Sequence, residues 1–354
     1  MSAFKPPVTV QKKGSASRRL VPLLVLLLIA VLAAAAFFLT RDEDEDKDSA
    51  NPNGENTTNV TLFLSYIPSV QFAPLYVAAD KGYFAEEGIN IEFENSFNES
   101  DGVDRLAIND LQFGIISGEQ VILARAQNKP LVYVMEWYHS FPVGVVVPAD
   151  SDIAAPADLA GKKVGVPGPF GASYIGLRAF LTAAGLTESD ITLEPIGFTA
   201  PDQMCQRTVE AAVVYVANEP LTISQCYEVR VFNISDYANL VANGLVTNEE
   251  TLQNNPDLVR SMIRAIQRGI ADTIADPQAA FDISLKYVTD LPEDQHDTQR
   301  QVLLNSVELW KSDTIGLTNP DAWVQTQTVL MDTGLLENPL PDLTQAYRTD
   351  LLPE

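Results

Sequence analysis

From residue 60 onward, the chain alternates short apolar runs with amphipathic stretches, and the same order of segments occurs twice. Runs such as VTLFLS (60–65) and AAVVY (211–215) are typical of strands, and the stretches between them have the length and pattern of helices. This alternation indicates α/β units built on mostly parallel sheets. The sequence therefore predicts two Rossmann-like halves that are related by topology rather than by sequence identity.

The individual elements follow from the same patterns. We expect strands at 60–65, 89–94, 112–116, 131–135, 143–147, 163–166, 191–195, 211–215 and 228–232. Between them we expect helices at 73–87, 102–108, 119–127, 173–184 and 219–225. The remainder of the chain is mostly helical, with predicted helices at 256–275, 277–288, 298–311 and 320–332. Proline opens three of these, where its missing N–H costs no hydrogen bond. Three arginines spaced by four residues are expected to form a solvated face, or else a contact with a partner subunit: Arg260, Arg264 and Arg268.

An uncharged apolar segment, LVPLLVLLLIAVLAAAAFFL (20–39), precedes this α/β part. At about 1.5 Å per residue, its length matches a hydrocarbon core of about 30 Å. Basic residues lie before the segment and an acidic run at 42–48 follows it. The positive-inside rule then puts the N-terminus in the cytoplasm and the rest of the chain outside. We expect a single-pass protein of the cell membrane whose α/β part lies on the extracytoplasmic side.

Two interpretations of the apolar segment remain open. Three alanines at 33–35 offer a cleavage site, but a signal peptide has a shorter apolar stretch. We therefore favour an uncleaved signal anchor. The predicted organisation is a basic cytoplasmic segment at 1–19, a signal anchor or signal peptide at 20–40, and an acidic and polar tether at 41–59.

The composition excludes several classes of protein. Asp and Glu number 47 against 23 Lys and Arg, which gives a net charge of −24. Such a surface repels phosphate backbones, so no nucleic-acid partner is expected. Two cysteines and two histidines are too few for a disulfide scaffold, a Cys-rich metal site or a zinc hydrolase. We predict no metal and no catalytic residue. Cys205 and Cys226 fit either a disulfide or two buried thiols.

Aromatic residues follow several of the predicted strands. In open α/β sheets, ligands bind beyond the carboxyl ends of the strands. Aromatic side chains gather there in both halves, which favours a flat apolar or heteroaromatic ligand. Asn218 and Glu219 open a helix at one such end, where they serve either as ligand contacts or as helix caps. His139 is expected to be a ligand contact or a half-buried residue rather than a base.

The loop PGPFGASY (167–174) is rich in glycine, but its spacing does not match dinucleotide or P-loop motifs. Gly171 to Tyr174 can still offer backbone N–H groups at a helix start. The loop contains neither lysine nor arginine. This composition argues against a strongly anionic ligand.

Three runs of sequence carry a resemblance to a known family: YIPSVQFAPLYVAADKGYFAEEGINIEFE, DLAGKKVGVPGPFGASYIGLRAFLTAAGL and VVYVANEP. Over residues 58–340, the chain resembles the solute-binding proteins related to thiamine pyrimidine synthase. The resemblance implies the type II periplasmic binding protein fold, in which two lobes with two hinge crossovers close on a small heteroaromatic solute and deliver it to an ABC importer. The variants QFAPLYVA, PGPFGASYIGLRA and ANEP look most like the riboflavin-binding branch. The Cys-rich iron-binding motif of the eukaryotic synthases is absent, which speaks against an enzyme.

The resemblance also implies how the chain divides. Lobe 1 is expected to contain 60–146 and 236–354, and lobe 2 to contain 147–235. The strands at the hinge are expected near 143–147 and 232–237.

Carried over residue by residue, the resemblance implies nine ligand contacts: Tyr66, Gln71, Phe72, Trp137, Tyr138, Tyr174, Tyr215, Asn218 and Glu219. Riboflavin would be a transported ligand and not a cofactor, and the partner would be the importer's permease. The alternative is a binding protein for a thiamine pyrimidine precursor or another small heteroaromatic or organosulfur solute. A pyrimidine-synthase-like enzyme is a less favoured alternative.

Overall fold

The structure is a computed structural model and describes residues 57–353. The predicted segments at 1–19 and 20–40 and most of the tether at 41–59 lie outside the described residues. Within 57–353, no helix has both the length and the apolar character needed to cross a bilayer.

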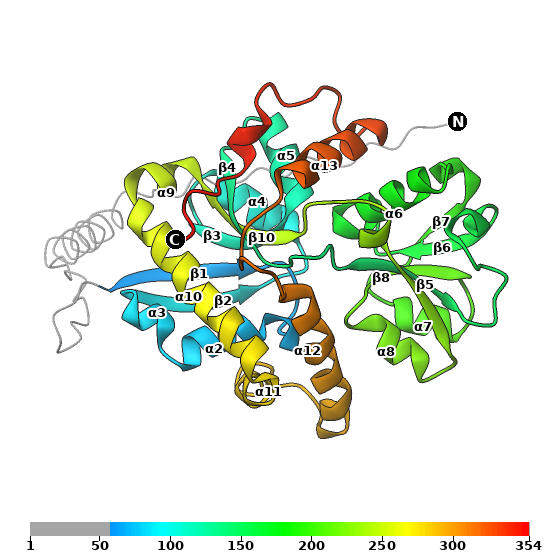
Figure 1. The fold of residues 1–354 in the computed structure, drawn as a ribbon, viewed down its shortest axis with the longest axis horizontal. Helices are drawn as coiled ribbons and strands as arrows, with labels where there is room; N and C mark the ends of the chain where they lie inside the picture. Colours follow the sequence, from blue (N-terminus) through cyan, green and yellow to red (C-terminus); the bar gives the residue numbers. More distant parts are fainter. Residues whose placement is uncertain (1–56, 354) are drawn as a thin grey trace, which may run out of the picture. The chain divides into compact units, whose positions relative to one another are not determined.

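The strands of residues 57–353 form two five-stranded sheets (Figure 1). The first has the order β2-β1-β3-β10-β4 and consists of β1 (Thr58–Leu64), β2 (Ile89–Asn95), β3 (Phe113–Ser117), β4 (Leu131–Glu136) and β10 (Asn243–Asn248). The second has the order β7-β6-β8-β5-β9 and consists of β5 (Val143–Pro148), β6 (Lys163–Val166), β7 (Thr192–Pro195), β8 (Ala211–Tyr215) and β9 (Val229–Asn233).

The two sheets share one plan. β1 pairs in parallel with β2 and β3, and β6 pairs in parallel with β7 and β8. The fourth strand of each sheet, β10 or β5, is antiparallel to both of its neighbours. The predicted α/β halves are therefore confirmed. β3, β4 and β5 are buried along their whole length, which explains their continuous apolar sequences.

Helices flank both sheets. With the first sheet lie α2 (Ala73–Asp80), α3 (Tyr83–Glu86), α4 (Glu99–Ala107), α5 (Gly118–Ala126), α9 (Glu249–Asn254), α10 (Pro256–Ala275), α11 (Pro277–Ser284), α12 (His296–Trp310) and α13 (Pro320–Asp332). With the second lie α6 (Gly171–Ala183), α7 (Ala200–Cys205) and α8 (Glu219–Ser224). The predicted helix 73–87 is in fact two helices, because the chain turns through Gly82 with a φ of 78°. β10, α7 and α9 were not predicted.

The chain crosses twice between the sheets, and the first crossing corrects the predicted boundary between 146 and 147. β5 pairs with β8 and β9 of the second sheet, so residues from 143 belong to lobe 2 and the crossing lies at 137–142. The second crossing follows η4 (Ile234–Asp236) and ends at β10. An apolar run such as VGVVVP has the same pattern whichever sheet it joins. Only its pairing with other strands assigns it to a lobe.

The arginines of α10 do not form a simple solvated face. Arg268 donates to Glu86 at 2.6 Å and lies 3.8 Å from the centre of the Tyr83 ring. Arg264 donates to Glu87 at 2.9 Å. These contacts join α10 to the short helix α3, which has too few residues to be stable alone.

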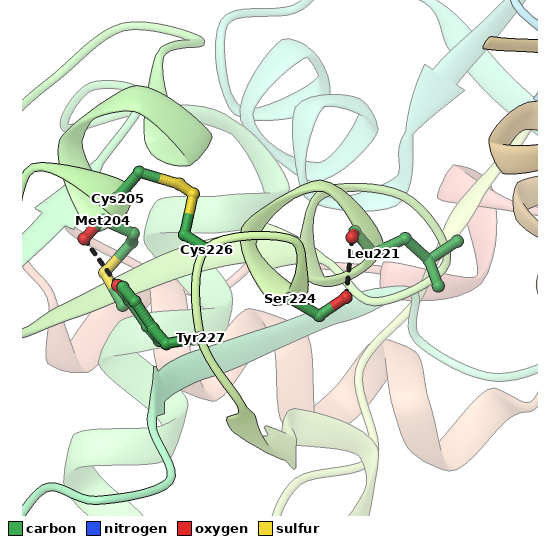
Figure 2. The surroundings of a disulfide bond; sticks show 6 residues. All are labelled: Met204, Cys205, Leu221, Ser224, Cys226 and Tyr227. Atoms are coloured by element: carbon green, nitrogen blue, oxygen red, sulfur yellow. Dashed lines mark hydrogen bonds between the residues drawn. A yellow bond between two sulfur atoms is a disulfide. The ribbon is translucent and has the colours of Figure 1, made fainter. Parts of the chain in front are cut away.

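Cys205 and Cys226 form a disulfide, which decides between the two alternatives (Figure 2). The bond joins the end of α7 to the segment after α8, with 5.7 Å between the Cα atoms. α7 and α8 cover a small core of the second sheet that is separate from the main core of the protein: Val146, Ala200, Met204, Val209, Ala212, Val214 and Ile223. The disulfide therefore reinforces the part of lobe 2 with the smallest apolar core.

Replacing both cysteines by serine should lower the free energy of unfolding by about 3 kcal/mol, because the unfolded chain regains the freedom of a loop of this size. Thermal unfolding of the full chain with and without reductant is the measurement. The C205S/C226S variant should unfold at one lower temperature in both conditions, whereas the wild type should match it only when reduced. Equal melting temperatures for the oxidised wild type and the variant would contradict the stabilising role.

Candidate ligand-binding site

A cavity of about 460 Å³ lies between the two sheets. It is bordered by the ends of β1, β3 and β8, by the first crossing, and by the loop that leads into α6. Its volume falls within the range of about 300–1,000 Å³ that is usual for small-molecule sites. The position agrees with the rule that ligands bind beyond the carboxyl ends of strands.

Eight of the nine predicted contacts line this cavity. Lobe 1 and the first crossing contribute Tyr66, Gln71, Phe72, Trp137 and Tyr138, and lobe 2 contributes Tyr215, Asn218 and Glu219. Residues far apart in the sequence therefore meet at one site.

Tyr174 does not line the cavity, and this prediction is corrected. Its hydroxyl donates to Glu188 Oε2 at 2.6 Å and accepts from Arg178 Nη1 at 2.8 Å. Ala172 and Ser173, which directly precede Tyr174 on α6, line the cavity instead. Successive helical residues point about 100° apart, so neighbours in sequence face different surroundings.

The aromatic rim of the cavity was only partly predicted. Phe97 follows β2 and Phe198 follows β7, so they occupy equivalent places in the two lobes. Their rings stack across the lobes with centroids 5.0 Å apart, and the Tyr66 ring meets both edge-on. Both phenylalanines are about half exposed, at 51% and 52%. Their position directly after two edge strands was the feature of the sequence that could have predicted these two residues. Phe170 lines the same cavity.

The first crossing is anchored by aromatic packing. The Tyr138 ring lies parallel to the Trp310 ring of α12 at 6.0 Å, and Trp137 meets Trp310 edge-on at 5.7 Å. The Phe72 ring packs against the Trp137 ring, with 6.3 Å between the ring centres. The cavity wall at the crossing is therefore built from rings whose positions are determined by the core of lobe 1.

Two glutamates are the charged residues that line the cavity within the described chain. Glu99 Oε1 accepts from the backbone N–H of Ser117 at 2.7 Å and from its hydroxyl at 2.8 Å. Glu219 Oε2 accepts from the backbone N–H of Tyr215 at 3.1 Å. No cationic residue lines the cavity beside either glutamate in the described part of the chain. Burial raises the pKa of Glu219 to about 7 and raises the pKa of Glu99 above its usual value.

Each carboxylate also acts on a tyrosine of the other lobe. Burial, and then the charge of Glu219, raise the pKa of Tyr66 to about 12. Burial, and then the charge of Glu99, raise the pKa of Tyr215 well above its usual value. Both carboxylates line the same cavity, which brings each near a tyrosine of the other lobe.

A chain of hydrogen bonds crosses between the lobes beneath the cavity. The Tyr215 hydroxyl of lobe 2 donates to Asn243 Oδ1 at 3.3 Å, and Asn243 Nδ2 donates to the Ser117 hydroxyl at 3.1 Å. Ser117 in turn donates to Glu99. Asn243 is the first residue of β10, so this network lies where the second crossing enters lobe 1.

His139 is not among the residues that line the cavity. Its Nδ1 lies 3.0 Å from Glu136 Oε1, and its side chain is 53% exposed. Of the two readings offered for His139, a ligand contact and a half-buried residue, its position fits the second.

Two α/β lobes that exchange strands around a central cavity define the fold of the periplasmic binding proteins. The structure matches the periplasmic aliphatic sulphonate binding protein SsuA from Escherichia coli with a TM-score of 0.67 at 17% identity, covering 81% of this chain and 91% of that one. The predicted two-lobed fold with two crossings is thereby confirmed.

The chain belongs to the NMT1/THI5 like family, whose model matches residues 69–280. It is 39% identical to the riboflavin-binding protein RibY of Chloroflexus aurantiacus over 312 residues, which cover 85% of this chain and 88% of that protein. It is 28% identical to the formylaminopyrimidine-binding protein of Halalkalibacterium halodurans, over 65% of this chain and 71% of that protein. The predicted family is confirmed, and the expectation of a binding protein rather than an enzyme agrees with these two relatives.

Glu119 lies buried behind the cavity and yields a prediction about stability. Burial, and then the charge of Glu99, raise its pKa to about 8 from the ordinary value of 4.5. The folded protein therefore holds this proton more tightly than the unfolded chain does. The free energy of unfolding falls as the pH rises from 4.5 to 8, because ionisation is easier in the unfolded state.

Glu119→Gln removes the part of this dependence that Glu119 contributes, since glutamine stays neutral, whereas Glu99 and Glu219 keep theirs. Its melting temperature should be near that of the wild type at pH 5 and several degrees higher at pH 8, as followed by circular dichroism. The exposed Glu337 gives a matched control, because E337Q changes the net charge equally without touching the site. Parallel pH profiles for wild type and E119Q would show that Glu119 does not carry the pKa shift.

Proposed function

We propose that this chain is the extracytoplasmic solute-binding subunit of an ABC importer, and that it captures riboflavin between its lobes and delivers it to the permease. The observation that carries the proposal is the cavity, whose walls are aromatic on both sides: Tyr66, Phe72, Trp137 and Tyr138 from lobe 1 and the first crossing, and Phe170, Phe198 and Tyr215 from lobe 2. The identity with RibY over most of both chains supports it.

The chemistry of riboflavin suits this arrangement. Its three-ring system is flat, and stacking on each aromatic side chain contributes about 0.5–1.5 kcal/mol beyond the area buried. The ring edge and the hydroxylated side chain need hydrogen-bonding partners. The cavity offers these at Gln71, Asn98, Gln120, Ser173 and Asn218. Closure of the two lobes would bury the ring between the two walls.

A thiamine pyrimidine precursor is the second candidate, because of the formylaminopyrimidine-binding relative. A single pyrimidine ring is much smaller than a three-ring system with a sugar-like chain. It would leave much of the 460 Å³ cavity unfilled, and unfilled apolar space forfeits packing energy. The cavity volume therefore favours riboflavin.

For the N-terminal region, we propose an uncleaved membrane anchor at 20–40 that keeps the binding domain at the outer side of the cell membrane. The support is the length of the uncharged segment and the basic residues before it. The permease would then receive riboflavin from a tethered rather than a free binding protein.

Titration of the full chain with riboflavin, followed by quenching of flavin fluorescence, tests the ligand. We expect a Kd of about 1 μM or below, since such affinities are ordinary for a ligand of this size enclosed by aromatic walls. Tyr66→Ala removes a ring that touches both rim phenylalanines and should weaken binding about tenfold or more. Tyr83→Ala is the matched control, because Tyr83 is a half-buried tyrosine of the same lobe outside the cavity.

Absence of both quenching and a thermal shift with riboflavin would contradict the proposal. A larger thermal shift with formylaminopyrimidine than with riboflavin would favour the second candidate instead. Equal losses in Y66A and Y83A would remove the assignment of Tyr66 to the binding site.

A further inference from the structure

The two cavity glutamates accept hydrogen bonds from equivalent strand ends in the two lobes, although Glu99 opens α4, before β3, and Glu219 opens α8, after β8. β3 and β8 each hold the third position in their sheets, next to β1 and β6. Ser117 is the last residue of β3 and Tyr215 is the last residue of β8. The backbone N–H of Ser117 donates to Glu99, and the backbone N–H of Tyr215 donates to Glu219.

These backbone donors stand where an α/β protein ordinarily meets an anionic ligand. N–H groups beyond the carboxyl ends of strands are the common partners of phosphate groups. Here the chain's own carboxylates already accept from both of them. A phosphate entering the cavity would find these donors engaged and would face two carboxyl groups instead, which carry like charge when they are ionised.

No cation within the described residues offsets these charges. The residues that line the cavity include no Lys, Arg or His, and neither Glu99 nor Glu219 has an ion-pair partner in that part of the chain. Arginines of neighbouring helices are engaged elsewhere: Arg105 with Glu94 and Arg178 with Glu188. Between two protein lobes, charges interact more strongly than in water.

We propose that Glu99 and Glu219 determine specificity at this site by excluding phosphate monoesters, so that the cavity takes the uncharged flavin and rejects its phosphorylated form. This inference rests on the proposed function. A phosphorylated flavin must then first react with water, which breaks the ester and releases inorganic phosphate and riboflavin. A hydrolytic reaction of the phosphatase class therefore precedes capture wherever flavin nucleotides are the source.

The test compares two probes that share one ring system, riboflavin and flavin mononucleotide, on the full chain at pH 8. This pH lies above the pKa of about 7 of Glu219, so that carboxyl is ionised. The wild type should bind riboflavin at least about thirtyfold more tightly than flavin mononucleotide. This ratio of affinities tests, without any variant, whether the cavity rejects the phosphorylated flavin.

Glu99→Gln and Glu219→Gln test the assignment to residues. Glutamine keeps an acceptor oxygen for the Ser117 or Tyr215 N–H and removes the charge. Each variant should lower the ratio of riboflavin affinity to flavin mononucleotide affinity about three- to tenfold, whatever change in riboflavin binding the substitution brings. E337Q, with the same change of charge at the surface, should leave the ratio unchanged. Circular dichroism of each variant checks that it is folded.

The outcomes separate the two proposals. Equal affinity of the wild type for both flavins would overturn the specificity inference and leave the proposed function standing. An unchanged ratio in both glutamine variants would overturn the roles of Glu99 and Glu219. Absence of binding for both flavins would remove the proposed function, and the inference with it.

Discussion

The exchange of single antiparallel strands between the two lobes is the constraint on which the rest of this structure depends. β5 follows a lobe 1 strand directly but completes the lobe 2 sheet, and β10 returns to complete the sheet of lobe 1. Each crossing therefore leads directly into the strand that completes the sheet of the lobe it enters. Neither sheet is complete without the strand that follows its crossing. The cavity lies where these crossings leave the sheets, so the geometry of the ligand site is tied to the backbone pairing of both lobes.

The polar network beneath the cavity couples the same elements. Asn243 accepts from Tyr215 of lobe 2 and donates to Ser117 of lobe 1, and it stands at the first position of β10. A change in the angle between the lobes would alter the Tyr215–Asn243 hydrogen bond directly, whereas Asn243 and Ser117 are paired residues of one sheet. Ser117 also holds the carboxylate of Glu99, so this network links a cavity carboxylate to the contact between the lobes.

Local patterns predicted the regular elements well, and they failed where a long-range partner decides the outcome. Helix 256–275 is predictable to the residue because proline opens it and its apolar residues keep a 3.6-residue period. The lobe of β5 and the existence of β10 depend on which strands they pair with, which no local pattern contains. The site shows the same division. The aromatic residues that follow strands were predicted from the sequence, whereas the direction in which Tyr174 points depends on the rotation of α6 about its axis. Glu99 was not predicted, because its place in the cavity depends on a contact with Ser117, 18 residues away.

In the described part of this acidic chain, the two cavity carboxylates have no cationic partner. With 23 basic residues against 47 acidic ones, most basic side chains of the described part are engaged in ion pairs at the surface of the lobes, as Arg105 and Arg268 are. Burial then raises the pKa values of Glu99, Glu119 and Glu219 instead of a partner lowering them. A ligand that supplies hydrogen-bond donors, as hydroxyl groups and a ring N–H do, compensates such carboxylates without bringing a charge. Selection of neutral, donor-rich solutes by these carboxylates is the role that we propose for them.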